Sequence, residues 1–386
     1  MTCLADFKRL HRARVPKMFY DYAESGSWTE HTFRRNAAAL DEITLRQRVA
    51  VDISERSVRG RMLGQDWRLP LAIAPTGLTG MQHADGEIVA AQAAEAFGIP
   101  FTLSTMSICS IEDVAAHTSA PFWFQLYVMR DREFIAALIE RAKVSGCSAL
   151  VLTLDLQILG QRHKDVKNRM TAPPQLTLKN LLNMATKPRW CAGMLGTRRY
   201  NFGNVVGHAK GVSDLASLGA WSAQQLDPTL NWDDVAWVKE QWGGPLILKG
   251  ILDVADVPPA LEAGADAIVV SNHGGRQLDG APASIEVLSE IARMVDGRAQ
   301  VWMDGGIRSG QDILKARALG ADAVMTGKAF LNALGAFGGA GVTKLLEIFA
   351  KELDLTMAFC GHTDIDSVDA SIIYHRNTHH AQQEAL

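Results

Sequence analysis

Short apolar runs alternate with alanine-rich helical segments over most of the chain, and this rhythm limits the possible folds more than any other feature. The runs predict strands at Leu71–Ala74, Phe101–Leu103, Phe122–Leu126, Leu150–Leu154, Leu246–Leu248, Ala267–Val270, Val301–Met303 and Ala323–Met325. The segments between them predict helices, for example at Gly86–Phe97, Asp131–Lys143, Ala255–Ala263, Ser284–Val295 and Gly310–Leu319. Strands that alternate with helices form a parallel sheet with right-handed crossovers. Eight strands close such an α/β sheet into a TIM (β/α)8 barrel.

A weak internal repeat supports this interpretation. Gly146-Cys147-Ser148-Ala149, Gly264-Ala265-Asp266-Ala267 and Gly320-Ala321-Asp322-Ala323 each stand where a predicted helix ends and a strand begins. Glycine suits the left-handed residue that stops a helix.

The residues before the first barrel strand predict an extension. Residues 3–15 and 29–40 resemble short helices, and Arg59–Arg68 resembles a hairpin. We therefore expect an N-terminal helical and hairpin extension of the barrel.

One interval breaks the rhythm, because no strand is predicted between Leu154 and Leu246. Residues 156–230 are therefore expected to form a long insertion in the fourth βα loop, before a helix near Trp232–Gln241. Such loops line the active site of a barrel, so the insertion is expected to cover it. Residues 1–386 are expected to be one domain.

The composition excludes several classes of protein. Of the 386 residues, 47% are hydrophobic and 21% are charged, which is enough apolar material for a large core. The net charge of −3 gives no global basic field for nucleic acid. The five cysteines form no C-x-x-C pair, so reduced thiols in a cytoplasmic compartment are expected. Residues 1–17 lack the apolar core of a signal peptide, and no apolar run approaches a membrane span.

The loop Ser271–Asp279 follows the buried strand Ala267–Val270 directly. It places His273 and Arg276 three residues apart, with two glycines between them. Histidine is suited to take a proton near neutral pH, and arginine grips a carboxylate with two hydrogen bonds. A tight turn with a surface histidine is the plainer interpretation. The combination of base, anion grip and glycines at a strand end favours a functional site.

Nearly every strand end carries polar, small or charged residues, which would converge on one rim of the barrel. In order these are Pro75-Thr76-Gly77, Ser104-Thr105, Gln125-Leu126-Tyr127, Thr153-Leu154-Asp155, Lys249-Gly250, the His273 loop, Asp304-Gly305-Gly306-Ile307-Arg308 and Thr326-Gly327-Lys328. The last two loops combine bare backbone amides, helix starts and the cations Arg308 and Lys328. Each glycine pair alone is a simple loop signal. Together, in the usual phosphate slots of this fold, they predict a phosphorylated ligand.

Lys249 emerges from a buried strand, so its charge must face a pocket. It is a candidate for a Schiff base or for stabilising a negative cofactor. Asp155 is placed to orient His273. No cluster has metal-ligand spacing, so no metal is expected. The histidine-rich tail at residues 375–380 is interpreted as a frayed terminus.

These loops closely resemble the family of FMN-dependent 2-hydroxy-acid oxidases and dehydrogenases. The matching stretches are Lys17–Ala23, Ala74–Gly77, Thr102–Thr105, Phe124–Val128, Leu248–Gly250, Ser271–Asp279 and Asp304–Arg308. They cover essentially the whole chain, and the sequence SNHGGRQLD is the most specific. The resemblance implies FMN as cofactor and oxidation of an L-2-hydroxy acid to a 2-oxo acid, with L-lactate favoured over mandelate and longer acids.

The resemblance implies a role for each substrate-site residue. His273 is the base and Asp155 its partner. Arg276 and Tyr22 hold the substrate carboxylate, and Arg162 is the second arginine near it. The resemblance also implies that Tyr127 contacts the hydroxyl group and that Lys249 lies near the flavin atoms that become negative on reduction.

The cofactor roles are implied in the same way. The ring and ribityl chain are held by Pro75, Thr76, Gly77, Ser104, Gln125, Thr153, Lys249 and Ser271, and the ribityl chain and phosphate by Asp304, Gly305, Gly306, Arg308, Gly327 and Lys328. Lys328 departs from the family pattern, where arginine is common. It keeps the charge but loses the two-pronged geometry, so FMN binding is expected to be weaker. Met106 is expected to shape the pocket for the substrate side chain.

The insertion carries no acidic residue between Val166 and Ser213. Basic, apolar and aromatic residues are interleaved there, which suits an anionic membrane surface, although a solvated lid fits the same pattern. We expect peripheral binding at the inner face of the cell membrane, or a cytoplasmic protein. Electrons would pass to quinone or a respiratory acceptor, and the resemblance implies a homo-tetramer. The alternatives are a soluble oxidase that reduces O2, a non-redox isomerase or lyase that uses Lys249, and an inactive flavin-binding barrel.

Overall fold

The structure is a computed structural model, and it describes residues 1–170, 175–212, 225 and 227–374. Eight strands form one parallel sheet: β3 (Leu71–Ile73), β4 (Thr102–Ser104), β5 (Trp123–Tyr127), β6 (Ala149–Thr153), β7 (Leu246–Ile251), β8 (Ala267–Val270), β9 (Gln300–Met303) and β10 (Ala323–Thr326). Their order is β3-β10-β9-β8-β7-β6-β5-β4. A parallel bridge between Ile73 and Phe101 joins the two edges. The predicted TIM barrel is confirmed, and most strand ends differ from the prediction by one or two residues.

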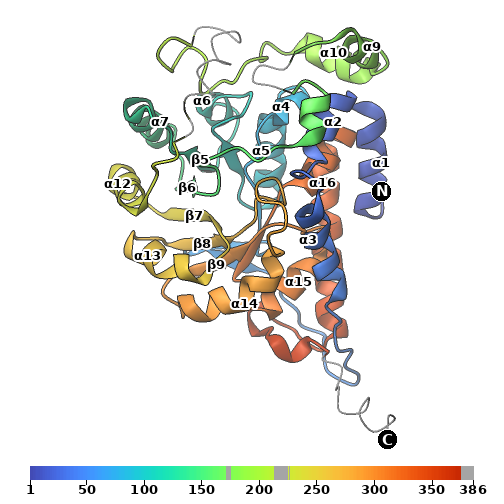
Figure 1. The fold of residues 1–386 in the computed structure, drawn as a ribbon. Helices are drawn as coiled ribbons and strands as arrows, with labels where there is room; N and C mark the ends of the chain where they lie inside the picture. Colours follow the sequence, from blue (N-terminus) through green and yellow to red (C-terminus); the bar gives the residue numbers. More distant parts are fainter. Residues whose placement is uncertain (171–174, 213–224, 226, 375–386) are drawn as a thin grey trace, which may run out of the picture.

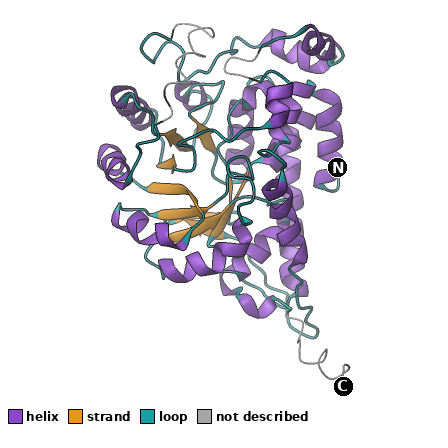
Figure 2. Cartoon of the chain, in the orientation of Figure 1, coloured by secondary structure: helices purple, strands orange, loops and turns teal. Residues whose placement is uncertain are grey.

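Helices surround this sheet, as the purple helices around the orange strands in Figure 2 show. Those that follow the strands are α4 (Thr79–Gln82), α5 (Gly86–Phe97), α6 (Ile111–Ala115), α7 (Arg132–Val144), α12 (Trp232–Trp242), α13 (Val257–Glu262), α14 (Ser284–Val295), α15 (Gly310–Ala318) and α16 (Lys328–Phe359). Gly146, Gly264 and Gly320 follow α7, α13 and α15 with φ of 75°, 86° and 101°. The repeated glycines therefore stop helices, as the sequence predicts.

The segment predicted as one helix at Ala255–Ala263 is divided in the structure. A 3-10 turn, η1 (Val254–Asp256), precedes the α-helix α13, whose first turn contains two prolines. Proline lacks the backbone N–H that would continue the α-helical ladder backwards but fits the first turn of a new helix. Two further 3-10 turns, η2 (Ile365–Ser367) and η3 (Ala370–Ile372), lie near the C-terminus.

The interior of the barrel is packed, so it is not a channel. Trp123 and Trp302 stack there with ring centroids 5.2 Å apart. An antiparallel hairpin, β1 (Gly60–Met62) and β2 (Gln65–Trp67), contributes the buried Met62 to the same cluster. The hairpin predicted at Arg59–Arg68 is thus confirmed, and it joins this inner core.

Three helices precede the barrel strands: α1 (Leu4–Arg14), α2 (Lys17–Ala23) and α3 (His31–Glu42). The helix α1 lies along the long helix α16, as Figure 1 shows. Of the described helices, α16 alone is long and apolar enough to cross a membrane, but over half of its apolar window is buried against the rest of the fold. It also breaks at Phe337 and Gly338. These features identify α16 as a core helix of the barrel.

The helices of the insertion labelled in Figure 1 lie at the top of the view, above α2. The described helices of the insertion are α8 (His163–Lys167), α9 (Leu178–Ala185) and α10 (Pro188–Gly196). The described residues between β6 and β7 contain no strand, as expected. Parts of the predicted insertion, residues 171–174, 213–224 and 226, lie outside the described residues, as does the histidine-rich tail.

Candidate active site

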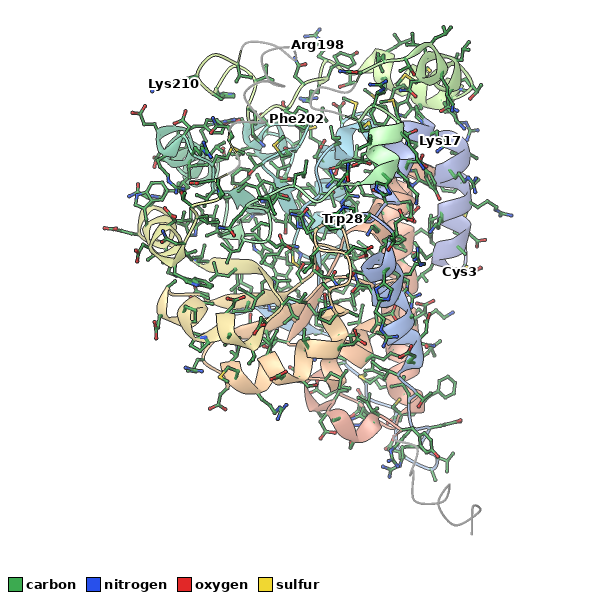
Figure 3. The ribbon with its side chains drawn as sticks, viewed as in Figure 1. Cys3, Lys17, Trp28, Arg198, Phe202 and Lys210 are labelled. Carbon is green, nitrogen blue, oxygen red and sulfur yellow. The ribbon has the colours of Figure 1, made fainter. Side chains whose placement is uncertain are left out.

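A cavity of about 1110 Å³ opens at the C-terminal ends of the barrel strands, and all eight strand ends contribute to it. Most of the site residues predicted from the sequence line this cavity: Tyr22, Pro75, Thr76, Gly77, Ser104, Tyr127, Thr153, Arg162, Lys249, His273, Arg276, Asp304, Gly305, Gly306, Arg308, Gly327 and Lys328. Phe202 of the insertion lines it as well, with Arg198 and Lys210 further out in Figure 3. The parallel register therefore brings together side chains that are far apart in the sequence.

Three predicted residues lie behind the cavity wall, each bonded to a residue that lines it. The side-chain oxygen Oε1 of Gln125 accepts a hydrogen bond from Ser104 Oγ at 3.0 Å. Ser271 Oγ accepts one from Lys249 Nζ at 2.9 Å. Asp155 lies beside His273. Gln125 and Ser271 therefore lie directly beside residues that line the cavity, as Asp155 lies beside His273.

His273 and Asp155 lie side by side at the rim of the cavity. Asp155 Oδ1 lies 2.8 Å from His273 Nδ1. The carboxylate therefore assigns the proton of the neutral ring to Nδ1, which leaves Nε2 free as a base. Burial alone would raise the pKa of Asp155, but the charges of His273 and Lys249 outweigh burial and lower it. Asp155 is thus a stable counter-charge for a protonated imidazole.

The backbone around His273 is held in an uncommon conformation. His273, Gly274 and Gly275 have φ of 57°, 63° and 73°, all in the left-handed region. A Cβ on Gly275 would meet the backbone nitrogen of Phe33 at 2.4 Å, so only glycine allows this approach. A non-glycine residue with positive φ is costly and is found most often at functional sites. Of the two glycines between His273 and Arg276, Gly275 thus packs against α3, whereas a Cβ on Gly274 would meet Lys328 Nζ at 3.1 Å.

Two arginines and two tyrosines, Arg162, Arg276, Tyr22 and Tyr127, line one part of the cavity. The guanidinium of Arg276 lies 4.6 Å from the Tyr22 ring centroid, and that of Arg162 lies 5.9 Å from it. Burial, followed by the charge of Arg162, lowers the pKa of Arg276. Burial and Asp155 raise the pKa of Tyr127, which keeps its hydroxyl protonated. A carboxylate would relieve the repulsion between the two cations.

Lys249 lines the cavity and is held there as a cation. Its Nζ lies 3.0 Å from Asp304 Oδ2, and its side chain is almost fully buried. Burial alone would lower the pKa of Lys249, but Asp304 and Asp155 outweigh burial and raise it. A Schiff-base nucleophile must be a neutral amine, so this environment argues against the non-redox alternative.

The strand ends fit a flat polar ring. Gln125 Nε2, Thr153 Oγ1 and Asp304 Oδ1 are buried and have no hydrogen-bond partner within the described part of the chain. Each unpaired buried group costs about 1–3 kcal/mol, so a ligand that pairs them would be stabilised. A flavin ring carries both the donors and the acceptors that these atoms require.

The seventh and eighth loops fit a phosphate. Gly305 and Gly306 have φ of 89° and 96°, which exposes their backbone to the cavity, and α16 begins directly after Gly327. Arg308 lines the cavity but is also paired with Asp41 Oδ1 of α3 at 2.7 Å. Lys328 Nζ donates to the Gly274 carbonyl at 2.5 Å. These loops therefore contribute two cations, and one of them, Arg308, is also bound to Asp41 of α3.

Several residues of the cavity are not predicted from the sequence. Phe33 and Asn36 of α3 line the cavity, and Asn36 exchanges two side-chain hydrogen bonds with Asn272 at 2.8 and 2.7 Å. No local pattern marks α3 as a cavity wall, because these contacts span more than 200 residues of sequence. Asp165 is bonded to Arg162 and follows it by three residues, so helical spacing was the available signal.

The rim of this parallel barrel has loops that fit a phosphate and unpaired polar atoms that fit a flat ring. It also has a histidine beside a carboxylate, and two arginines. This combination is typical of one class of protein, the TIM-barrel flavoenzymes that act on a small carboxylate. The chain matches the FMN-dependent dehydrogenase family over residues 11–375. It is 44% identical to an L-lactate dehydrogenase of Caulobacter sp. (strain K31), covering 97% of this chain and 98% of the relative. It is 42% identical to an L-lactate dehydrogenase of Vibrio cholerae serotype O1 (strain M66-2), covering 95% and 97% respectively.

Solved structures agree with this match. The monotopic membrane protein (S)-mandelate dehydrogenase superposes with a TM-score of 0.92 at 36% identity, covering 97% of this chain and all of that one. The chain therefore belongs to the FMN-dependent dehydrogenase family. It is an FMN-dependent enzyme that oxidises a 2-hydroxy acid, as the sequence resemblance implies.

Proposed function

We propose that the enzyme oxidises L-lactate to pyruvate and passes the electrons to quinone or another respiratory acceptor. The pairing of His273 Nδ1 with Asp155 at 2.8 Å, beside Arg276 and Tyr22 in one cavity, carries the proposal. The names of the two bacterial relatives favour lactate as the substrate.

The substrate roles follow from charge and position. Arg276 and Arg162, with the Tyr22 hydroxyl, bind the carboxylate of the acid. This fixes the 2-hydroxyl group between Tyr127 and His273, and Nε2 of His273 takes the hydroxyl proton. Asp155 stabilises the imidazolium that results.

The cofactor roles follow in the same way. When bound, FMN would supply the two-electron acceptor of the reaction and would take up the C2 hydrogen together with both electrons, while the hydroxyl proton goes to His273. The ring of FMN would be held by Pro75, Thr76, Gly77, Ser104, Gln125, Thr153 and Ser271, and its ribityl phosphate by Asp304, Gly305, Gly306, Arg308, Gly327 and Lys328. Lys249, kept charged by Asp304, opposes the negative charge of the reduced state.

The proposed contact of Lys328 with the phosphate makes the affinity for FMN depend on pH. Burial and Arg276 lower the pKa of Lys328 to about 7, and a bound phosphate would raise it. Below pH 7 the free site already carries this proton, whereas above pH 7 binding must take one up. FMN affinity is expected to fall by up to about tenfold per pH unit above 7. Quenching of FMN fluorescence by apoprotein between pH 7 and 9 measures it.

The matched variant is Lys328→Arg. Arginine stays charged over this whole range, so the affinity of this variant is expected to be independent of pH. An equal slope in both proteins would assign the titration to another group.

The insertion supports a site at a membrane. Leu178, Leu181 and Leu182 of α9 are exposed, and no described residue of α9 is buried. The exposed cations Lys179 and Arg189 lie on α9 and α10. Exposed leucines beside basic charge fit the interface of an anionic bilayer. We place the enzyme peripherally at the inner face of the membrane, where quinone is available, and expect a homo-tetramer.

Replacing Leu178 and Leu182 with serine is expected to weaken binding to anionic phospholipid vesicles at least about tenfold, because each leucine contributes about 1.5–3 kcal/mol when buried. Co-sedimentation measures this. The control is Leu355→Ser on α16, which removes an exposed leucine elsewhere. Unchanged sedimentation of the double variant would leave the insertion as a solvated lid.

Steady-state turnover of the holoenzyme tests the proposed function. L- and D-lactate, L- and D-mandelate and longer 2-hydroxy acids are compared with a dye acceptor and with O2. We expect L-lactate to give the highest kcat/KM, with the dye and without peroxide. Equal turnover with O2 and formation of peroxide would indicate the oxidase alternative, and a preference for mandelate would change the substrate.

A further inference from the structure

Arg162 has a dedicated acidic partner, unlike Arg276, the other arginine proposed to bind the substrate carboxylate. Its Nε donates to Asp165 Oδ2 at 2.5 Å, and both side chains are largely buried, with exposed fractions of 15% and 8%. Arg276 instead donates from Nη1 to the neutral carbonyl of Tyr22 at 2.6 Å and to Ser25 Oγ at 3.0 Å. The charge of Arg162 is therefore balanced by a carboxylate, whereas the bonds of Arg276 are to neutral groups.

The bond through Nε leaves the outer face of the Arg162 guanidinium available. Within the described residues, Nε makes the one side-chain hydrogen bond of Arg162, so its two terminal nitrogens can serve an anion. Asp165 Oδ1 is also buried without a partner among those residues. The carboxylate is thus held against the guanidinium and is not consumed by other contacts.

The short helix that carries Asp165 is fixed on both sides. Asn168 Nδ2 donates to Asp21 Oδ2 of α2 at 2.7 Å, and Lys164 Nζ donates to the Glu24 carbonyl at 2.9 Å. Upstream, a Cβ on Gly160 would meet the Arg276 carbonyl at 2.7 Å, so glycine lets this segment of the insertion pack directly on the His273 loop. The residues on either side of Arg162 are therefore anchored, and Asp165 has a defined position.

We propose that Asp165 is a positioning residue for substrate binding: it holds Arg162 by Nε so that the terminal nitrogens face the substrate carboxylate beside Arg276. This inference rests on the proposed carboxylate-binding role of Arg162. A long arginine loses rotamer freedom when it binds, and a fixed partner removes that cost in advance. The insertion thus supplies a preorganised half of the anion site.

The sign of the change in anion affinity when Asp165 is replaced distinguishes a positioning role from an effect of net charge. Removing a negative group beside an anion site should tighten anion binding if only net charge matters. Loss of positioning should weaken it. Asp165→Asn is therefore expected to raise the KM for L-lactate and the Kd for pyruvate about tenfold, while kcat changes less than twofold. The Kd is measured from the change in flavin absorbance when pyruvate is added to the oxidised holoenzyme.

A double-mutant cycle shows whether Asp165 acts through Arg162. We expect Arg162→Met to weaken pyruvate binding and Asp165→Asn to add nothing in that background. The matched control is Asp85→Asn, which removes the ion pair of Asp85 Oδ1 with Arg199 of the insertion, 3.0 Å long and outside the cavity. FMN content and melting temperature of each variant establish that it folds.

Each result decides the matter. A tighter or unchanged Kd in Asp165→Asn, or an equal loss with and without Arg162, would overturn the positioning role. An unchanged Kd in Arg162→Met alone would instead refute the proposed role of Arg162, and the inference would fall with it. These two failures are distinguished by the single Arg162 variant.

Discussion

His273→Gln is expected to retain bound FMN and to lose reduction of the flavin by substrate, with a rate lower by about 10²–10⁴-fold or more. Glutamine can keep a hydrogen bond to Asp155 Oδ1, which lies 2.8 Å from the native ring, but it has no basic nitrogen. The hydroxyl proton then has no acceptor, and Asp155 has no cation to stabilise. The residues at the other strand ends that are proposed to hold FMN are not altered.

Anaerobic stopped-flow absorbance of the flavin measures this loss, and bound FMN is determined separately after denaturation. His117→Gln is the control, because that histidine is bonded to the Asp113 carbonyl on the outside of the barrel. Rapid flavin reduction in His273→Gln would refute the assignment of the base.

Arg276→Met is expected to lower kcat/KM by roughly 30- to 4,000-fold. Truncating one partner of a desolvated, hydrogen-bonded charge pair costs about 2–5 kcal/mol, and each 1.4 kcal/mol is tenfold. The guanidinium also donates to the Tyr22 carbonyl at 2.6 Å, so its loss removes a support of α2. The measurement is steady-state turnover with L-lactate over a range wide enough to separate kcat from KM.

Arg276→Lys tests how much of this effect is geometry. Lysine keeps the positive charge but cannot serve Tyr22, Ser25 and a carboxylate together, so only part of the activity is expected to return. A kcat/KM within threefold of the native value in the methionine variant would place the carboxylate elsewhere.

The barrel could be predicted from the sequence because its signals are local. A run such as Ala267–Val270 is short, apolar and β-branched, and its register in a parallel sheet places the next residue at the rim. The site residues at the strand ends follow from that register alone. Residues that bind through distant contacts carry no such signal.

The contacts of Arg308 show what could not be predicted from the sequence. The sequence predicts Arg308 as a cation for phosphate, and the structure in addition pairs it with Asp41, 267 residues away in the chain. Asn36 reaches Asn272 over a similar separation. The packing of α3 on the cavity depends on three-dimensional placement, which periodicity and spacing do not encode. The glycines and cations of these loops could therefore be predicted from the sequence, but the contact of Arg308 with α3 could not.

Anaerobic mixing of the holoenzyme with one equivalent of L-lactate tests the central claim most directly. The account predicts loss of the oxidised flavin absorbance and formation of one equivalent of pyruvate, with D-lactate inert. A flavin that stays oxidised with L-lactate and with every other L-2-hydroxy acid would contradict it.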